Sequence, residues 1–241
     1  MVERKRRFVS VLLVALALIA GAAFVDLRAR LTPEPPITNA NTTDVAPEGQ
    51  QLAAEALGSL AVKGRAPKTD YARSQFGKIW EKAGYCDVRN YILARDLVNV
   101  KTVSDSDCTV LEGDLTDPYT GETIHFVRGP SSSASVQIDH VVALSDAWQK
   151  GAQQMELPQR QKFANDPLNL LAVDGPANIK KGDSDAATWL PTNKPYRCRY
   201  VARQIAVKQT YNLWVTEAEH DAMTQVLKSC PGQTLPVVEL P

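Results

Sequence analysis

The sequence is poor in histidine and has no excess of charge of either sign. Its 241 residues include three histidines, and 27 basic residues match 27 acidic ones. A hydrolase whose metal centre is built from imidazole ligands needs more histidine than this. Tight nonspecific coating of nucleic acid needs clustered cations that bind phosphate. Composition alone therefore disfavours both classes, while 44% apolar residues suffice for a buried core.

Cysteine is also scarce, and its spacing lacks the usual zinc motifs. The four cysteines, Cys86, Cys108, Cys198 and Cys230, form no Cys-x-x-Cys or Cys-His pair, which disfavours a zinc site. Four cysteines instead fit an exported protein with two disulfides. Three pairings are open. The sequential pairing, Cys86 with Cys108 and Cys198 with Cys230, closes short loops and ties each helix to its neighbour.

The N-terminus has the composition of a targeting segment. Residues 4–7 are basic and residues 8–25 are apolar or small, which predicts a signal peptide or an uncleaved membrane anchor over residues 1–25. The remaining chain is slightly acidic, with 23 basic and 26 acidic residues. We expect the protein to be secreted or anchored at the cell surface, and to be a monomer.

Beyond this segment the pattern predicts a linker, one domain and a tail. Residues 26–50 are rich in Pro, Thr, Asn and Glu, as flexible linkers are, and the domain spans 51–232 before a frayed tail over 233–241. Apolar spacing predicts helices over 51–62, 73–82, 88–98, 146–153, 157–163 and 194–211, with a last helix after the capping box Thr216–Glu219. Residues 108–115 and 123–127 predict a hairpin around an Asp-Pro-Tyr-Thr-Gly turn.

The most informative stretch is residues 136–185. Alternating apolar residues over 136–144 predict a strand that directs Asp139 and His140 to opposite faces. After a helical insert, the apolar run 168–173 predicts a second strand, and Asp-Gly-Pro then starts a helix with Asn178 and Lys181 on one face. The unit is a strand, an insert, a strand and a helix.

The side chains of this unit indicate which chemistry it can support. Asp139 and Asn178 offer hard oxygen ligands for a divalent cation. His140, next to the first ligand, can act as a general base toward water. The metal would stabilise the charge that develops on the phosphate. The sequence thus points to metal-assisted phosphodiester hydrolysis.

The motifs Asp139-His140, Asn169-Leu170 and Asn178-Ile-Lys-Lys-Gly-Asp resemble those of HNH, or ββα-metal, nucleases. The resemblance implies Asp139 and Asn178 as metal ligands, His140 as general base, and Asn169 as a brace of the loop. Lys181 matches a lysine that often follows the motif, with phosphate contact as its expected role. Asn178 in place of a third-position histidine favours Mg²⁺ or Mn²⁺ over zinc.

Further motifs widen the resemblance to about residues 66–230, among them Tyr-Ala-Arg-Ser-Gln-Phe at 71–76, Asp-Pro-Tyr-Thr-Gly at 117–121 and Trp-Leu-Pro at 189–191. The chain is similar to secreted bacterial HNH endonucleases related to the C-terminal domain of modification-dependent restriction enzymes. The implied fold class is α+β, with a ββα-metal core embedded in a mainly helical domain.

Several cations are candidate phosphate ligands, namely Arg73, Arg89, Lys180 and Arg203. Residues 178–211 hold seven basic and two acidic side chains, so a positive face beside the site is predicted. The alternative is structural, because an Arg on an amphipathic helix often pairs with a nearby Asp such as Asp87 or Asp96. Two alternatives also remain for the carboxylates of Asp174, Asp183 and Asp185. Each could support the site through hydrogen bonds or lie at the surface.

We therefore expect an exported endonuclease that cuts DNA, or RNA, without sequence specificity, since no base-reading motif is present. Two rival hypotheses remain. One is a cell-surface binding module with an HNH-like fold and no activity. The other is a different metal-dependent hydrolase, for which further histidines are expected.

Overall fold

The computed structural model describes residues 50–104 and 107–237. The predicted signal or anchor and almost all of the predicted linker lie outside the described residues. No helix within this described part is long and apolar enough to cross a membrane. Helices and strands are both well represented, which confirms the α+β class.

The helices are short apart from α7. They are α2 (Ala53–Ser59), α3 (Val88–Asp96), α4 (Leu144–Gln149), α5 (Leu157–Asn165), α6 (Gly175–Lys181), α7 (Arg197–Thr210) and α8 (Glu217–Leu227). Within residues 50–104 and 107–237, three 3-10 helices accompany them: η1 (Arg73–Phe76), η2 (Ala152–Gln154) and η3 (Lys194–Tyr196). The capping prediction for the last helix is confirmed, because the Thr216 side chain accepts from the backbone N–H of Glu219.

In the part of the chain that the structure describes, the strands form three small antiparallel sheets. Their members are β1 (Lys82–Ala83), β2 (Cys86–Asp87), β3 (Val98–Ser104), β4 (Asp107–Thr116), β5 (Thr123–Val127), β6 (Val136–His140) and β7 (Leu170–Asp174). β1 pairs with β2, β3–β4–β5 form a three-stranded sheet, and β6 pairs with β7. The predicted hairpin of residues 108–115 and 123–127 is confirmed as β4 and β5, while β3 was not predicted.

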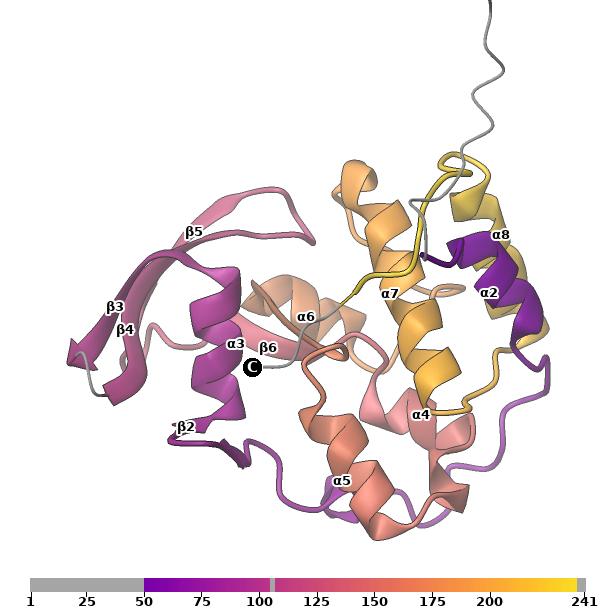
Figure 1. The fold of residues 1–241 in the computed structure, drawn as a ribbon, viewed down its shortest axis with the longest axis horizontal. Coiled ribbons are helices and arrows are strands. Elements are labelled where there is room, and N and C mark those ends of the chain that lie inside the picture. The colour runs from indigo at the N-terminus through magenta and orange to yellow at the C-terminus, as the bar shows by residue number, and fades with distance from the viewer. Residues whose placement is uncertain (1–49, 105–106, 238–241) are drawn as a thin grey trace, which may run out of the picture. The chain divides into compact units, whose positions relative to one another are not determined.

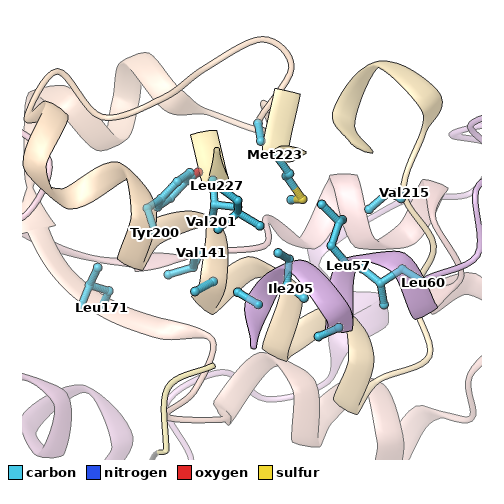
Figure 2. Packing of buried hydrophobic residues seen from close by; sticks show 14 of the residues in the cluster. Leu57, Leu60, Val141, Leu171, Tyr200, Val201, Ile205, Val215, Met223 and Leu227 are labelled. Atoms are coloured by element: carbon cyan, nitrogen blue, oxygen red, sulfur yellow. The ribbon is translucent and has the colours of Figure 1, made fainter. Parts of the chain in front are cut away.

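Both faces of the β6–β7 pair are buried. Leu171 and Val173 enter the cluster built on α2, α7 and α8, which Figure 2 shows from close by. Leu170 and Ala172 point the other way, into the cluster formed with α3, β4 and β5. This explains why β7 is a continuous apolar run rather than an alternating one. In Figure 1, α2, α7 and α8 lie together, and α3 lies against the β3–β5 sheet, as their contacts also show.

One predicted helix is wrong. Residues 73–82 were expected to be helical, but only the four residues of η1 are, and the chain then becomes irregular until β1. Gly77 adopts a φ of +66° and Trp80 a φ of +64°. These left-handed conformations end a right-handed helix, and they carry Trp80 toward the site.

The C-terminal tail is less frayed than predicted. The Leu235 N–H donates to the carbonyl of Gln51, the Ala53 N–H donates to the carbonyl of Gln233, and Leu52 pairs with Thr234. The chain as far as Leu235 is therefore hydrogen-bonded to the start of α2.

The four cysteines form the sequential disulfides, Cys86–Cys108 and Cys198–Cys230. The first joins β2 to β4. The second joins the start of α7 to the segment after α8. Because all four sulfurs are consumed, none is left as a thiolate ligand for zinc.

A buried network of charges joins α4, α7 and α8. The Lys150 ammonium lies 2.7 Å from Asp146, 2.8 Å from Asp185 and 2.6 Å from Glu219. Lys208 adds contacts to Glu219 at 3.0 Å and to Asp146 at 3.4 Å. The half-exposed Arg65 pairs with Asp146 and Asp185 from outside. The sequence left open whether Asp185 lies at the surface or in a supporting position, and the structure buries it in this network.

Candidate active site

A cleft of about 380 Å³ opens where β6, α6 and the start of α4 meet. Its polar walls include Asp139 and His140 from β6, Asn178 from α6, and Arg73 from η1. Tyr71, Gln137, Ser145 and Asp183 complete the polar lining. The strand-insert-strand-helix order predicted from the sequence is present as β6, α4 with α5, β7 and α6.

Local sequence explains how α6 starts beside the strand pair. The Asp174 carboxylate accepts from the backbone N–H of Ala177, which caps the helix, and Pro176 lies in its first turn. Gly175 lies so close to the carbonyl of Ala134 that an added Cβ would stand 2.1 Å from that oxygen. Only glycine allows this approach, and α6 thereby packs directly on the chain before β6.

His140 is held in one orientation by a backbone carbonyl. Its Nε2 lies 2.9 Å from the carbonyl oxygen of Ala164, at the end of α5. A carbonyl can only accept, so Nε2 carries the proton and the lone pair is on Nδ1. Burial lowers the pKa of His140 to about 3, and the ring is neutral at pH 7. Trp80 stacks on the imidazole with 6.3 Å between ring centroids.

Asp139 is buried, and both of its carboxylate oxygens are hydrogen-bonded. Tyr119 donates its hydroxyl to Oδ2 at 2.5 Å, and Lys181 donates its ammonium to Oδ1 at 2.9 Å. Burial raises the pKa of Asp139, while the charge of Lys181 and these hydrogen bonds oppose the rise. The carboxylate is fixed in position, and each oxygen keeps a second lone pair.

Lys181 is buried rather than directed into open solvent. Its ammonium contacts Asp139 and also donates to the carbonyl of His140 at 2.9 Å. It therefore ties α6 to the two chemically important residues of β6. The structure therefore brings Lys181 into the site as a partner of the Asp139 carboxylate, whereas phosphate contact was its expected role.

Asn169 and Asn178 have different surroundings. The Asn169 side chain is fully buried, and its Oδ1 accepts from the Val142 N–H at 2.8 Å. This is the bracing of the loop after β6 that the sequence predicted for Asn169. Asn178 donates through Nδ2 to Gln137 Oε1 at 2.9 Å. Gln137 thus accepts from the amide nitrogen of Asn178. The Asn178 oxygen is left as the group that can bind a cation.

The four predicted phosphate ligands do not share one location. Arg73 lines the cleft and is exposed, and Lys180 is exposed on α6. Arg89 on α3 does not line the cleft; burial and the nearby Arg128 lower its pKa. Arg203 is largely buried and donates to the backbone carbonyls of Pro167, Leu168 and Leu170. Its contacts support the loop that carries Asn169.

The predicted positive face is correspondingly weaker than the count of basic residues indicated. Lys181 and Lys208 are fully buried, as is most of Arg203. Charge counting along a sequence cannot distinguish a solvated cation from one that is paired inside the fold. The pairing of an Arg with Asp96 that the structural alternative expects is present, because the neighbouring Arg95 binds this carboxylate.

The oxygen ligands of the cleft fit a hard divalent cation. Asp139 and Asn178 supply one carboxylate and one amide oxygen, as magnesium sites with several remaining waters do. Within residues 50–104 and 107–237, no group of three or more His, Cys, Asp or Glu side chains could hold a metal. Zinc prefers three or four nitrogen or sulfur ligands, so this set of ligands suits magnesium or manganese better.

Sequence reasoning missed three contributors to the site. Tyr119 lies in a turn twenty residues before its partner Asp139. Gln137 orients Asn178, and Trp80 stacks on His140. The polar residue at 137 between apolar strand neighbours was a usable signal, because it shares a face with Asp139. No local signal pointed from Tyr119 or Trp80 to the site.

The sequence is similar to those of known proteins. The family described as GmrSD restriction endonucleases, C-terminal domain, matches residues 87–226. An "Uncharacterized secreted protein" of Arthroderma benhamiae is 38% identical over 176 residues, which is 72% of this chain and 82% of that protein. This relative is fungal, whereas the resemblance predicted a bacterial family. No solved structure matches the chain.

Proposed function

Because this chain belongs to the family of GmrSD restriction endonuclease C-terminal domains, which points to a nuclease-type hydrolase, we propose that it is a metal-dependent endonuclease of the HNH type. The observation that carries the proposal is the neutral, oriented His140 beside Asp139 and Asn178 in one cleft. In this proposal the β6–β7–α6 unit, two strands followed by a helix, takes the place of the ββα-metal core of that type.

In this proposal His140 takes a proton from the water that attacks phosphorus. The hydrogen bond from Nε2 to Ala164 directs the lone pair of Nδ1 to the reaction. A neutral imidazole has the free lone pair that a general base needs, and burial keeps His140 in that form. Asn169 keeps the loop after β6 in place, so that the imidazole does not shift.

Asp139 and Asn178 would hold the cation, Mg²⁺ or Mn²⁺. When bound, the cation supplies positive charge to the scissile phosphate and to the leaving 3′ oxygen. Lys181 and Tyr119 keep the Asp139 carboxylate ionised and oriented. Gln137 keeps the oxygen of Asn178 free for the cation.

The substrate is proposed to be DNA, with RNA as the second choice, cut without sequence specificity by a monomer. Arg73 and Lys180 are the exposed cations proposed to contact the phosphates. Export is proposed as well. Its support is the basic and apolar N-terminal sequence, the two disulfides, and the printed name of the fungal relative.

The first test compares wild-type residues 27–241 on supercoiled plasmid and on RNA, in Mg²⁺, in Mn²⁺ and in EDTA. Nicking is expected in either metal, with loss of at least 100-fold in rate in EDTA. A matched Asp139→Ala variant should lose a similar factor in Mg²⁺. Equal rates with and without EDTA would contradict the metal-dependent mechanism, and the better polymer identifies the substrate.

Arg73→Gln is expected to raise KM for DNA by about ten-fold or somewhat more, because a charge-assisted hydrogen bond to phosphate is worth about 1.5 kcal/mol. The kcat value should stay within about two-fold, since Arg73 binds phosphate before and during the reaction alike. Lys78→Gln is the matched control, because Lys78 is also exposed but does not line the cleft. Steady-state cleavage of a labelled duplex measures both, and an unchanged KM in Arg73→Gln would remove Arg73 from the binding site.

A further inference from the structure

The turn between β4 and β5 contacts the candidate site, although its Tyr119 lies 20 residues before Asp139 in the sequence. Asp117 is fully buried, and its Oδ2 accepts from the backbone N–H and the hydroxyl of Thr120. The Gly121 N–H donates to the carbonyl of Asp117, with Gly121 at a φ of +86°. Only a residue without Cβ adopts this conformation freely. The turn is therefore closed by its own hydrogen bonds.

One side of this turn reaches the first proposed metal ligand. Tyr119 is 1% exposed and donates its hydroxyl to Asp139 Oδ2. Its ring packs edge-on against Trp189, at 4.9 Å between centroids, and against Tyr200, at 5.7 Å. The Tyr119 carbonyl accepts from the Asn193 N–H at 2.9 Å. Ring and backbone are both fixed, so the hydroxyl is a rigid donor.

The other side reaches the helix of the second proposed ligand. Asp117 Oδ1 accepts from the backbone N–H of Asp174 at 2.8 Å. Asp174 is the residue that caps α6 by accepting from the Ala177 N–H at 2.7 Å. The first turn of α6 is thus fixed one turn before Asn178.

We propose that this turn, through Asp117 and Tyr119, is a positioning element that sets Asp139 and Asn178 at the separation a divalent cation needs. The inference rests on the proposed function. Two side chains two residues apart hold the strand of one ligand and the helix of the other. With Lys181 on Oδ1 and Tyr119 on Oδ2, the Asp139 carboxylate cannot rotate about its last bond. Hydrogen-bond partners of metal ligands tune affinity in this way.

The test uses Tyr119→Phe, which removes one oxygen and keeps the ring. Tyr200→Phe is the matched control, since it removes a hydroxyl from a neighbouring, equally buried tyrosine that accepts from Gln204 instead. Binding of Mn²⁺ is followed by the electron paramagnetic resonance signal of the free ion, in the absence of nucleic acid. Tyr119→Phe is expected to raise the Kd for Mn²⁺ about ten-fold, and Tyr200→Phe by less than two-fold.

A second pair of variants tests the helix side of the turn. Asp117→Asn keeps the shape but weakens acceptance from the Asp174 N–H, and a Kd about ten-fold higher is expected. Thr120→Val is its control, because it loses a contact within the turn and leaves the bond to Asp174 intact. In cleavage assays both Tyr119→Phe and Asp117→Asn should lower kcat and leave KM for DNA within about two-fold, because both side chains are buried. The urea midpoint of unfolding of each variant shows whether the substitution lowers the stability of the whole fold.

The outcomes separate this inference from the proposed function. Wild-type affinity for Mn²⁺ in Tyr119→Phe and Asp117→Asn, with binding lost in Asp139→Ala, would overturn the positioning role alone. An equal loss in Tyr200→Phe or Thr120→Val would also overturn it, since the effect would then be general. Mn²⁺ binding that is absent in the wild type, or unchanged in Asp139→Ala, would overturn the proposed metal site itself.

Discussion

Replacing His140 with alanine is expected to lower kcat for DNA cleavage by a factor of about 10² to 10⁴, the usual contribution of a positioned general base. The imidazole is the only histidine ring among the described residues that lines the cleft. Without the ring, the attacking water has no comparable proton acceptor at a fixed distance. KM should change little, because the ring is buried and offers little surface to the substrate. Plasmid nicking under saturating DNA measures the change.

His125→Ala is the matched control for this prediction. His125 lies on β5, where its exposed ring contacts Asp114 at 2.7 Å. It is a strand histidine paired with a carboxylate, and it does not line the cleft. Cleavage by His125→Ala should stay within two-fold of wild type. Wild-type rates in His140→Ala, with near-UV circular dichroism unchanged, would remove His140 from the mechanism.

Replacing Lys150 with methionine is expected to lower the free energy of unfolding by about 3–5 kcal/mol, as removal of one partner from a buried ion pair does. Three carboxylates, those of Asp146, Asp185 and Glu219, surround this ammonium at 2.6–2.8 Å. Without the Lys150 ammonium, these three carboxylates keep only Lys208 and the half-exposed Arg65 as charged partners in the described network. At about 2–4 °C per kcal/mol, the melting temperature should fall by about 10 °C. Urea titration and thermal melts measure both quantities.

Lys101→Met is the control for the stability prediction. Lys101 also contacts a carboxylate, Glu112, at 2.8 Å, but its side chain is 72% exposed. Exposed ion pairs contribute little, so the urea midpoint should not move measurably. A Lys150→Met midpoint equal to that of wild type would show that the network is not needed for stability.

The charge network also has a consequence for the site. Asp185 lies two residues after Asp183, which lines the cleft and accepts from Ser145 and Lys68. The loop after α6 is therefore bound through both Asp183 and Asp185. Their partners lie in or next to α4 and in the segment before η1. A loss of stability in Lys150→Met should consequently appear together with a smaller loss of activity, because the cleft wall is attached to the network.

The sequence by itself determined the local parts of this protein. Asp139 and His140 alternate across a strand, and Asp174 followed by glycine and proline starts a helix, because strand and helix periods are set by the backbone. Thr216 caps the last helix for the same local reason. The order of the motifs, with Asn169 and Asn178 after Asp139, was sufficient to predict the family. All of these signals lie within a few residues of the side chains they describe.

The tertiary structure alone decided which groups meet. Nothing near Tyr119 shows that its hydroxyl will reach Asp139, and nothing near Ala164 shows that its carbonyl will fix His140. Lys208 and Arg203 had the sequence pattern of a phosphate-binding face, yet packing buried them against carboxylates and backbone carbonyls. The physical reason is that burial and pairing depend on contacts between elements distant in the chain, and those contacts are chosen by the packing of the whole core.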